Sequence, residues 1–340
     1  MMTPHIARMQ RGVTLIELMV GMLVGMLAVM LISQVLLVSE SQKRTTTGGA
    51  DAQVNGALAL YTMQRDLQMA GYGITSSPNV IGCPISARFN GATPAGGFAA
   101  NLVPVVITPE ASRGGAVGDA VRILASSKGS FSVPTRVIPP GYAVGNTDFP
   151  VRAGVGFAQG DLALVATNDV QPCWVFQVTA APAARSLPRA NTAWNSANAP
   201  DVAYGDGAVL MNLGTLVDTR YEINGNVLQS ISFDFANPAT SPRPAVAVQP
   251  DIVNLRAYYG RDTSVPMDGV IDVFDQTTPT TNAGWLRVLA VRLVVVARSS
   301  TFEKEQVTVA NPEWSVGTDP AVAGATACAS GTGECITIDV

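Results

Sequence analysis

The chain has 340 residues, a hydrophobic fraction of 47%, a charged fraction of 14% and a formal net charge of −4. This apolar, weakly charged composition argues against intrinsic disorder and supplies ample material for a core. Basic residues form no run beyond Lys43-Arg44, so the composition also argues against a nucleic-acid partner.

The N-terminal region is the first predicted element. Residues 1–12 include Arg8 and Arg11 and no acidic residue, whereas residues 18–39 carry no charge. As a helix this uncharged run extends about 33 Å at ~1.5 Å per residue, against a hydrocarbon core of about 30 Å. By the positive-inside preference, the preceding arginines keep the N-terminus cytoplasmic and send residues 45–340 outward.

Glu17 is an acidic residue placed just inside this apolar run. A carboxylate costs about 2.5–3.5 kcal/mol near the centre of a membrane and less near an edge, so such a residue usually marks a function. A secretory signal has a shorter apolar core followed by a small-x-small cleavage site. A plain single-pass anchor fits the length and leaves Glu17 unexplained.

The stretch Arg11-Gly12-Val13-Thr14-Leu15-Ile16-Glu17-Leu18 resembles the processing site of type IV prepilins. The resemblance implies cleavage after Gly12 by a prepilin peptidase and methylation of the new N-terminus at Val13. Glu17 then lies four residues along from the Val13 amine and can neutralise it, on its own chain or on a neighbouring subunit. In a low dielectric an unpaired charge is heavily penalised, which gives this pair its purpose.

The helical pattern continues beyond the membrane-length run. Residues 40–69 are helix-compatible, with a loosened turn expected at residues 45–49 because that stretch ends in two glycines. An apolar stripe is expected to dock on a globular domain. The members of this stripe are Val54, Ala57, Leu58, Tyr61, Met63 and Leu67.

After Gly71 the pattern changes to short strand-like runs separated by turns. Residues 221–228 predict a hairpin, since Asn224-Gly225 suits a tight primed turn. The other predicted strands are residues 102–107, 120–125, 161–167, 174–179, 227–235, 252–259 and 286–297.

The predicted fold is α+β and type IV pilin-like, with a long N-terminal helix, half of it transmembrane, packed on a β-rich periplasmic domain. The expected boundaries are a cleaved leader at residues 1–12, a membrane or filament-core helix at 13–39, a periplasmic helix half at 40–72 and a β-rich head at 73–340.

Several later segments are similar to the PilW type of minor pilin. The resemblance implies a structural subunit that primes type IV pilus assembly and enters the filament near its tip, with adhesion and twitching motility as the associated processes. It implies an inner-membrane precursor, then a surface pilus, and as partners the prepilin peptidase, other minor pilins, the major pilin and a PilY-type tip adhesin. The similar segments are residues 65–73, 176–179, 259–262, 268–272 and 285–299.

Two alternatives stay open. A GspJ-like pseudopilin of a type II secretion system shares the same N-terminus. A membrane-tethered periplasmic hydrolase using Asp or Ser residues predicts no processing at Gly12. The only histidine, His5, precedes the predicted cleavage site, so a Ser-His-Asp relay and a histidine-based zinc site are not expected. The sequence therefore favours a protein that is not an enzyme and has no cofactor.

Four cysteines follow the membrane helix: Cys83, Cys173, Cys328 and Cys335. All lie on the predicted periplasmic side, where thiols oxidise. Four cysteines allow three pairings. We favour Cys328–Cys335, which closes a short glycine-containing loop, and this choice leaves Cys83–Cys173.

Asp262, Asp268 and Asp272 bracket another glycine-containing loop. Calcium favours clustered carboxylate and carbonyl oxygens, which makes these residues candidate ligands. The similar family segment has a denser Asp-Gly-Asp-Gly run, whereas residues 263–267 intervene here. An acidic surface turn is the main interpretation, and a calcium site is the alternative.

Overall fold

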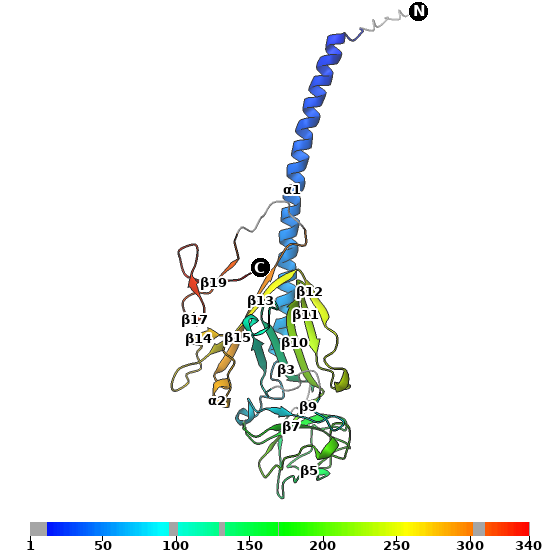
Figure 1. Cartoon of the computed structure of the whole chain (residues 1–340), viewed down its shortest axis with the longest axis vertical. Helices are drawn as coiled ribbons and strands as arrows, with labels where there is room; N and C mark the ends of the chain where they lie inside the picture. Colours follow the sequence, from blue (N-terminus) through cyan, green and yellow to red (C-terminus); the bar gives the residue numbers. More distant parts are fainter. Residues whose placement is uncertain (1–11, 95–100, 129–132, 169, 302–309, 340) are drawn as a thin grey trace, which may run out of the picture.

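The computed structural model describes residues 12–94, 101–128, 133–168, 170–301 and 310–339. The predicted leader therefore lies outside the described residues except for Gly12. Helix α1 (Leu15–Gln68) has 54 residues and is about 81 Å long at ~1.5 Å per residue. Its N-terminal part extends away from a β-rich head, and its C-terminal part packs against that head (Figure 1). The predicted α+β, pilin-like arrangement is confirmed.

The loosened turn predicted at residues 45–49 is wrong, since α1 is continuous there. The hydroxyls of Thr45 and Thr46 donate to carbonyl oxygens one turn earlier, so both side chains are satisfied inside the helix. Gly48 is buried, and a Cβ at this position would collide with the Oγ of Ser299. The glycine therefore permits a close approach between the helix and the head.

The face of α1 that docks on the head matches the predicted stripe only in part. Ala59 and Met63 are completely buried, whereas Val54, Leu58 and Tyr61 are 56%, 47% and 65% exposed. The docked face combines the small residues Gly48 and Ala59 with the larger Met63, and Leu67 packs against the same core. The predicted stripe is therefore confirmed at Met63 and Leu67 and wrong at Val54, Leu58 and Tyr61, which are exposed.

One five-stranded antiparallel sheet has the order β12-β11-β10-β3-β2. The predicted hairpin is confirmed, and its two-residue turn is one position later than expected. Gly225 and Asn226 both have positive φ, and Asn224 pairs with Val227. The strands are β2 (Val105–Thr108), β3 (Ala120–Ser126), β10 (Leu216–Asn224), β11 (Val227–Ser232) and β12 (Val246–Pro250).

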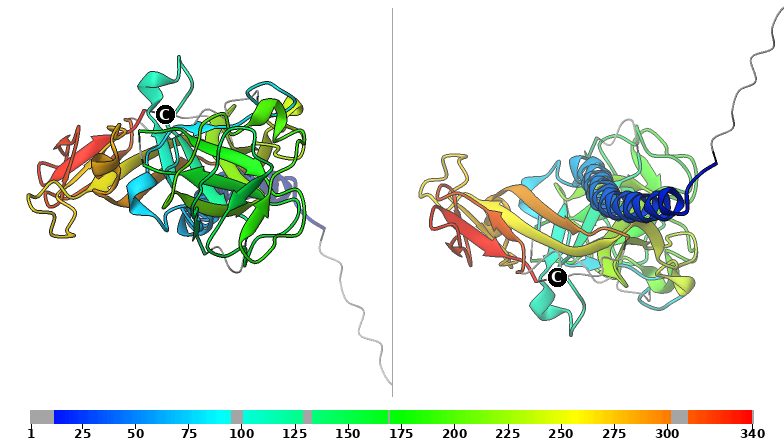
Figure 2. Two further views of the ribbon diagram at one scale, coloured as in Figure 1. Left: turned by 90° about the horizontal axis from the view of Figure 1, so that it is seen from below. Right: turned by 90° about the horizontal axis from the view of Figure 1, so that it is seen from above.

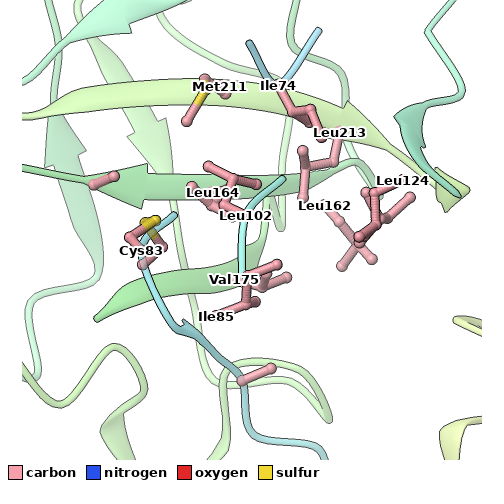
Figure 3. Packing of buried hydrophobic residues seen from close by; sticks show 14 of the residues in the cluster. Ile74, Cys83, Ile85, Leu102, Leu124, Leu162, Leu164, Val175, Met211 and Leu213 are labelled. Carbon is pink, nitrogen blue, oxygen red and sulfur yellow. A yellow bond between two sulfur atoms is a disulfide. The ribbon is translucent and has the colours of Figure 1, made fainter. Parts of the chain in front are cut away.

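A second five-stranded sheet, of order β1-β7-β6-β9-β4, lies at the end of the head farthest from the start of α1 (Figure 1). Its central strand β6 is buried on both faces, and Leu164, Val175 and Met211 form part of the core on one of them (Figure 3). A two-stranded sheet, β5-β8, lies nearby. The strands are β1 (Ile85–Ser86), β4 (Thr135–Arg136), β5 (Asp148–Pro150), β6 (Leu162–Ala166), β7 (Cys173–Gln177), β8 (Ser186–Pro188) and β9 (Val209–Gly214).

A third sheet, of order β15-β13-β14-β17, and a small sheet, β16-β19-β18, project to one side of the head (Figure 2). Every predicted strand overlaps an observed one, although β15 begins later than predicted because the short helix α2 precedes it. The elements are β13 (Ile252–Arg261), β14 (Val273–Asp275), α2 (Asn282–Trp285), β15 (Val288–Ala297), β16 (Glu313–Ser315), β17 (Ala321–Val322), β18 (Thr326–Ala327) and β19 (Glu334–Thr337). Four 3-10 turns complete the described elements: η1 (Pro78–Val80), η2 (Glu110–Ser112), η3 (Ser196–Asn198) and η4 (Pro238–Thr240).

Candidate functional site

The start of α1 is closed by a capping box. Thr14 is the N-cap, and its Oγ1 accepts from the Glu17 backbone N–H at 3.4 Å. The Thr14 backbone N–H in turn donates to Glu17 Oε2 at 3.3 Å. The carboxylate also lies at the positive end of the helix dipole. Thr14 belongs to the motif described above, but its capping role is not among the sequence predictions, although the Thr-x-x-Glu spacing is the signal for this box.

Gly12 and Val13 precede the cap and are exposed. A Cβ built on Gly12 meets nothing within 4 Å, so the structure leaves the bond between these two residues open to an incoming protein. Cleavage at this bond would create an amine one residue before Thr14. That amine would lie at the same end of α1 as the Glu17 carboxylate.

The apolar half of α1 has no cover from the head. Every residue from 12 to 47 is exposed. The docked part of the helix begins at Gly48, which is buried. Within the described residues, α1 is the helix long and apolar enough to cross a membrane. Such a continuous apolar surface needs lipid or other helices around it. Gly21 and Gly25 lie on this half, and a Cβ built at either position meets nothing within 4 Å, so a second helix can approach closely.

Residues 65–73 form the junction between α1 and the head, and their contacts explain why Asp66 and Gly71 stand there. Asp66 Oδ2 accepts from Tyr221 Oη of β10 at 2.6 Å. Burial raises the pKa of Tyr221 above its usual value, and the hydrogen bond to Asp66 raises it further, so the hydroxyl keeps its proton. Gly71 has a φ of +78°, and its N–H donates to the Leu124 carbonyl at 2.8 Å. A side chain there would also press on Thr75, so glycine is required.

Both pairs of cysteines are bonded in the structure. Cys83 joins Cys173 across 90 residues with a Cα–Cα distance of 5.9 Å, and Cys328 joins Cys335 across 7 residues with a distance of 4.9 Å. Both distances lie in the normal range for a disulfide. These are the pairs that the sequence analysis favours. Glu313 lies beside the second pair, but both sulfur atoms there are already bonded to each other.

The structure does not bring Asp262, Asp268 and Asp272 together as one ligand set in the described part of the chain. Asp262 is buried, and its Oδ2 accepts from the backbone N–H groups of Asp268 and Gly269 at 3.0 and 2.8 Å. These contacts shape the loop, and they occupy the oxygen that calcium would need.

Asp272 has a similar role at the other end of the loop. Its Oδ2 accepts from the backbone N–H of Thr263 at 2.6 Å and from the Thr263 hydroxyl at 2.9 Å. These donors hold the pKa of the Asp272 carboxyl below its usual value. The acidic residues of this segment thus act as caps for a turn, which agrees with the main interpretation of the sequence.

An exposed apolar helix of membrane length, attached to a disulfide-bonded β-rich head, defines the class of pilin-like proteins. Two family models match this chain. The model described as Type IV Pilus-assembly protein W matches residues 220–328, and the one described as Prokaryotic N-terminal methylation motif matches residues 7–33. Comparisons with curated proteins and with solved structures give no match. The two family matches confirm the predicted resemblance to PilW-type pilins, and they support a role related to type IV pili.

The two matched ranges cover different parts of the site. The N-terminal match includes Gly12, Val13 and Glu17, and this prepilin-type signal indicates anchoring in a membrane and recognition by a prepilin peptidase. The C-terminal match runs from β10 to Cys328 and includes β13 and β15. The match to a structural family of pilus assembly suggests a role other than catalysis.

Proposed function

We propose that this chain is a minor pilin that primes the assembly of a type IV pilus, enters the filament near its tip and catalyses no reaction. The observation that carries the proposal is the division of α1 into two halves. One half is fixed on the head by buried side chains, and the other exposes apolar side chains on every face. The exposed half needs lipid before assembly and the helices of other subunits afterwards.

The precursor in this proposal is a single-pass protein of the inner membrane with a periplasmic head. A prepilin peptidase removes residues 1–12 and the Val13 amine is methylated. Glu17 then pairs with that amine, on its own chain or on the next subunit, as the helix leaves the lipid. Because an unpaired charge in a packed core is costly, the pair selects the correct axial register.

The proposed partners are the major pilin, other minor pilins and a PilY-type adhesin at the tip. A GspJ-like pseudopilin would share the first part of α1. The match to a pilus-assembly family over residues 220–328 favours the pilus. Secretion of folded substrates by cells that lack this chain separates the two functions, because only loss of the pseudopilin would reduce it.

The test of the proposed function uses cells in which the gene for this chain is deleted. We expect few surface pili at an unchanged level of major pilin, with recovery when the full chain is supplied. We also expect the mature chain in filaments sheared from the complemented cells. A normal number of pili after deletion, together with absence of the chain from sheared filaments, would refute the proposal.

A further inference from the structure

A groove of ≈ 630 Å³ runs beside the docked half of α1. One wall is the helix at Leu60, Gln64 and Leu67, and the opposite wall is the first half of β15. Successive side chains of a strand point to opposite faces. Four consecutive residues, 288–291, line the groove, so side chains from both faces of β15 contribute to it. The groove therefore borders the edge of β15.

The edge of β15 is open. The strand has ten residues, lies at the end of its sheet and pairs only with β13 in the described part of the chain. Its outer side therefore presents backbone N–H and C=O groups without strand partners. A long apolar edge of this kind is a template for another strand. Leu289, on this edge, is 43% exposed.

The second sheet edge at the groove, formed by Pro104 and β2, is partly closed by contrast. Pro104 has no N–H, and its carbonyl accepts from the Leu124 N–H at 2.9 Å. The N–H of Ile107 donates to Tyr259 Oη at 2.6 Å, and its carbonyl accepts from Thr278 Oγ1 at 3.2 Å. A strand that enters the groove therefore finds a continuous row of pairing groups on β15, whereas the β2 edge is interrupted at Pro104 and Ile107.

We infer that an extended, uncharged segment of a different filament subunit adds as a strand to the edge of β15 at residues 288–293. The segment spans about 20 Å at ~3.3 Å per residue. Its side chains are uncharged because no charged residue lines the groove. Backbone hydrogen bonds supply affinity, and the apolar groove supplies specificity.

The position of the groove identifies the occupant as a filament neighbour. Leu58 and Tyr61, one helical turn or less from Leu60, are exposed on α1 and face other subunits if the proposed function holds, on which this inference rests. A second copy paired antiparallel through β15 is excluded by symmetry. The two-fold axis would be normal to the sheet, so it would also reverse the direction of α1, whereas both helices enter one membrane in the same direction.

The test compares Leu289→Lys with Leu289→Gln in the full-length chain in cells. A lysine on a strand edge blocks strand addition, whereas glutamine keeps the length without the charge. Val246→Lys is the matched control on β12, another exposed strand edge. We expect at least about tenfold less Leu289→Lys subunit in sheared filaments, since an unpaired buried charge costs several kcal/mol. Leu289→Gln and Val246→Lys should enter normally, and all variants should reach the wild-type level in the membrane.

A photoreactive phenylalanine derivative at position 289 then identifies the occupant. We expect an adduct in the filament with an uncharged stretch of another subunit. Adducts only with this chain or with lipid would overturn the inference. It would also be overturned if the wild-type chain is found in sheared filaments and the Leu289→Lys variant enters them to the same level. If the wild-type chain itself is absent from sheared filaments, the proposed function fails as well, and the two failures are thereby distinguished.

Discussion

Glu17 has two roles available to it, and they can be separated at the level of the single residue. In the structure its carboxylate closes the capping box with Thr14. In the proposed filament it neutralises the Val13 amine. A capping box accepts Glu or Gln at this position, whereas neutralisation of an amine requires a charge.

Substitutions at Glu17 therefore discriminate between capping and charge pairing. We expect Glu17→Ala and Glu17→Gln to insert in the membrane and to be cleaved after Gly12, yet to give fewer surface filaments at an unchanged subunit level. Glu17→Asp should be intermediate because it keeps the charge with a shorter reach. Filament counts by electron microscopy provide the measurement. Wild-type counts with Glu17→Gln would show that capping, and not charge, is the function of this residue.

Processing makes a second prediction at this scale. Gly12 is exposed and has no side chain, so a peptidase can approach the backbone on both sides. We expect Gly12→Val to leave full-length precursor in the inner membrane, because the added branched side chain blocks this approach. Val13→Phe is the control and should be processed, since many pilins have Phe after the cleavage site. A natural mature chain that starts anywhere other than Val13 in mass spectrometry would contradict the prediction.

The third prediction at the residue scale concerns calcium binding at Asp262. We expect neither calcium nor a chelator to change the melting temperature of the full chain in detergent, because backbone N–H groups already occupy its carboxylate. Asp262→Asn should lower the free energy of unfolding by about 1.5–3 kcal/mol, since hydrogen bonds to a charged group are lost. A rise in melting temperature on addition of calcium would restore the metal hypothesis.

At the scale of elements, the sequence predicts the existence of α1 and of the strands better than their contacts. Hydrophobicity selected Val54, Leu58 and Tyr61 as the docking face, but these large side chains are exposed. Met63 and Leu67 of the stripe do pack on the head, but Gly48 and Ala59 also form the contact, and such small residues carry little hydrophobic signal. The loosened turn predicted at residues 45–49 is absent because glycine in a sequence indicates flexibility and close packing equally.

Two adjacent glycines give the matched test of this explanation. A methyl group at Gly48 would collide with Ser299, whereas one at Gly49 meets nothing within 4 Å. We expect Gly49→Ala to raise the free energy of unfolding by up to about 1 kcal/mol through helix propensity. Gly48→Ala should lower it despite the same gain. Adding Ser299→Gly to Gly48→Ala should recover the loss, as urea unfolding of the full chain in detergent would reveal. Equal effects of the two alanines would contradict close packing at Gly48.

At the scale of the whole molecule, the head is built from sheets that join segments distant in the sequence. The pairing of β1 with β7 places Ile85 opposite Cys173, which brings the segment after α1 to the sheet farthest from the start of α1 (Figure 1). Periodicity identifies single strands but contains no information on which strands pair across such distances. The same limit applies to the candidate site, where the processing residues lie in one continuous motif and the groove beside β15 requires three distant segments.

The two disulfides should therefore differ in their effect on the whole head. In the chain-entropy account, a bond across 90 residues contributes about 4–5 kcal/mol and one across 7 residues about 2 kcal/mol. We expect the double substitution of Cys83 and Cys173 by serine to destabilise the full chain more than the same change at Cys328 and Cys335. Peptide mapping without reduction should show only these two pairs in the wild-type chain. A larger loss from the C-terminal pair would mean that the small sheet β16-β19-β18, and not the junction of β1 with β7, limits the stability of the head. The C-terminal loss should be smaller for a further structural reason: that bond closes a loop next to the antiparallel pair β18-β19, which already holds its ends together.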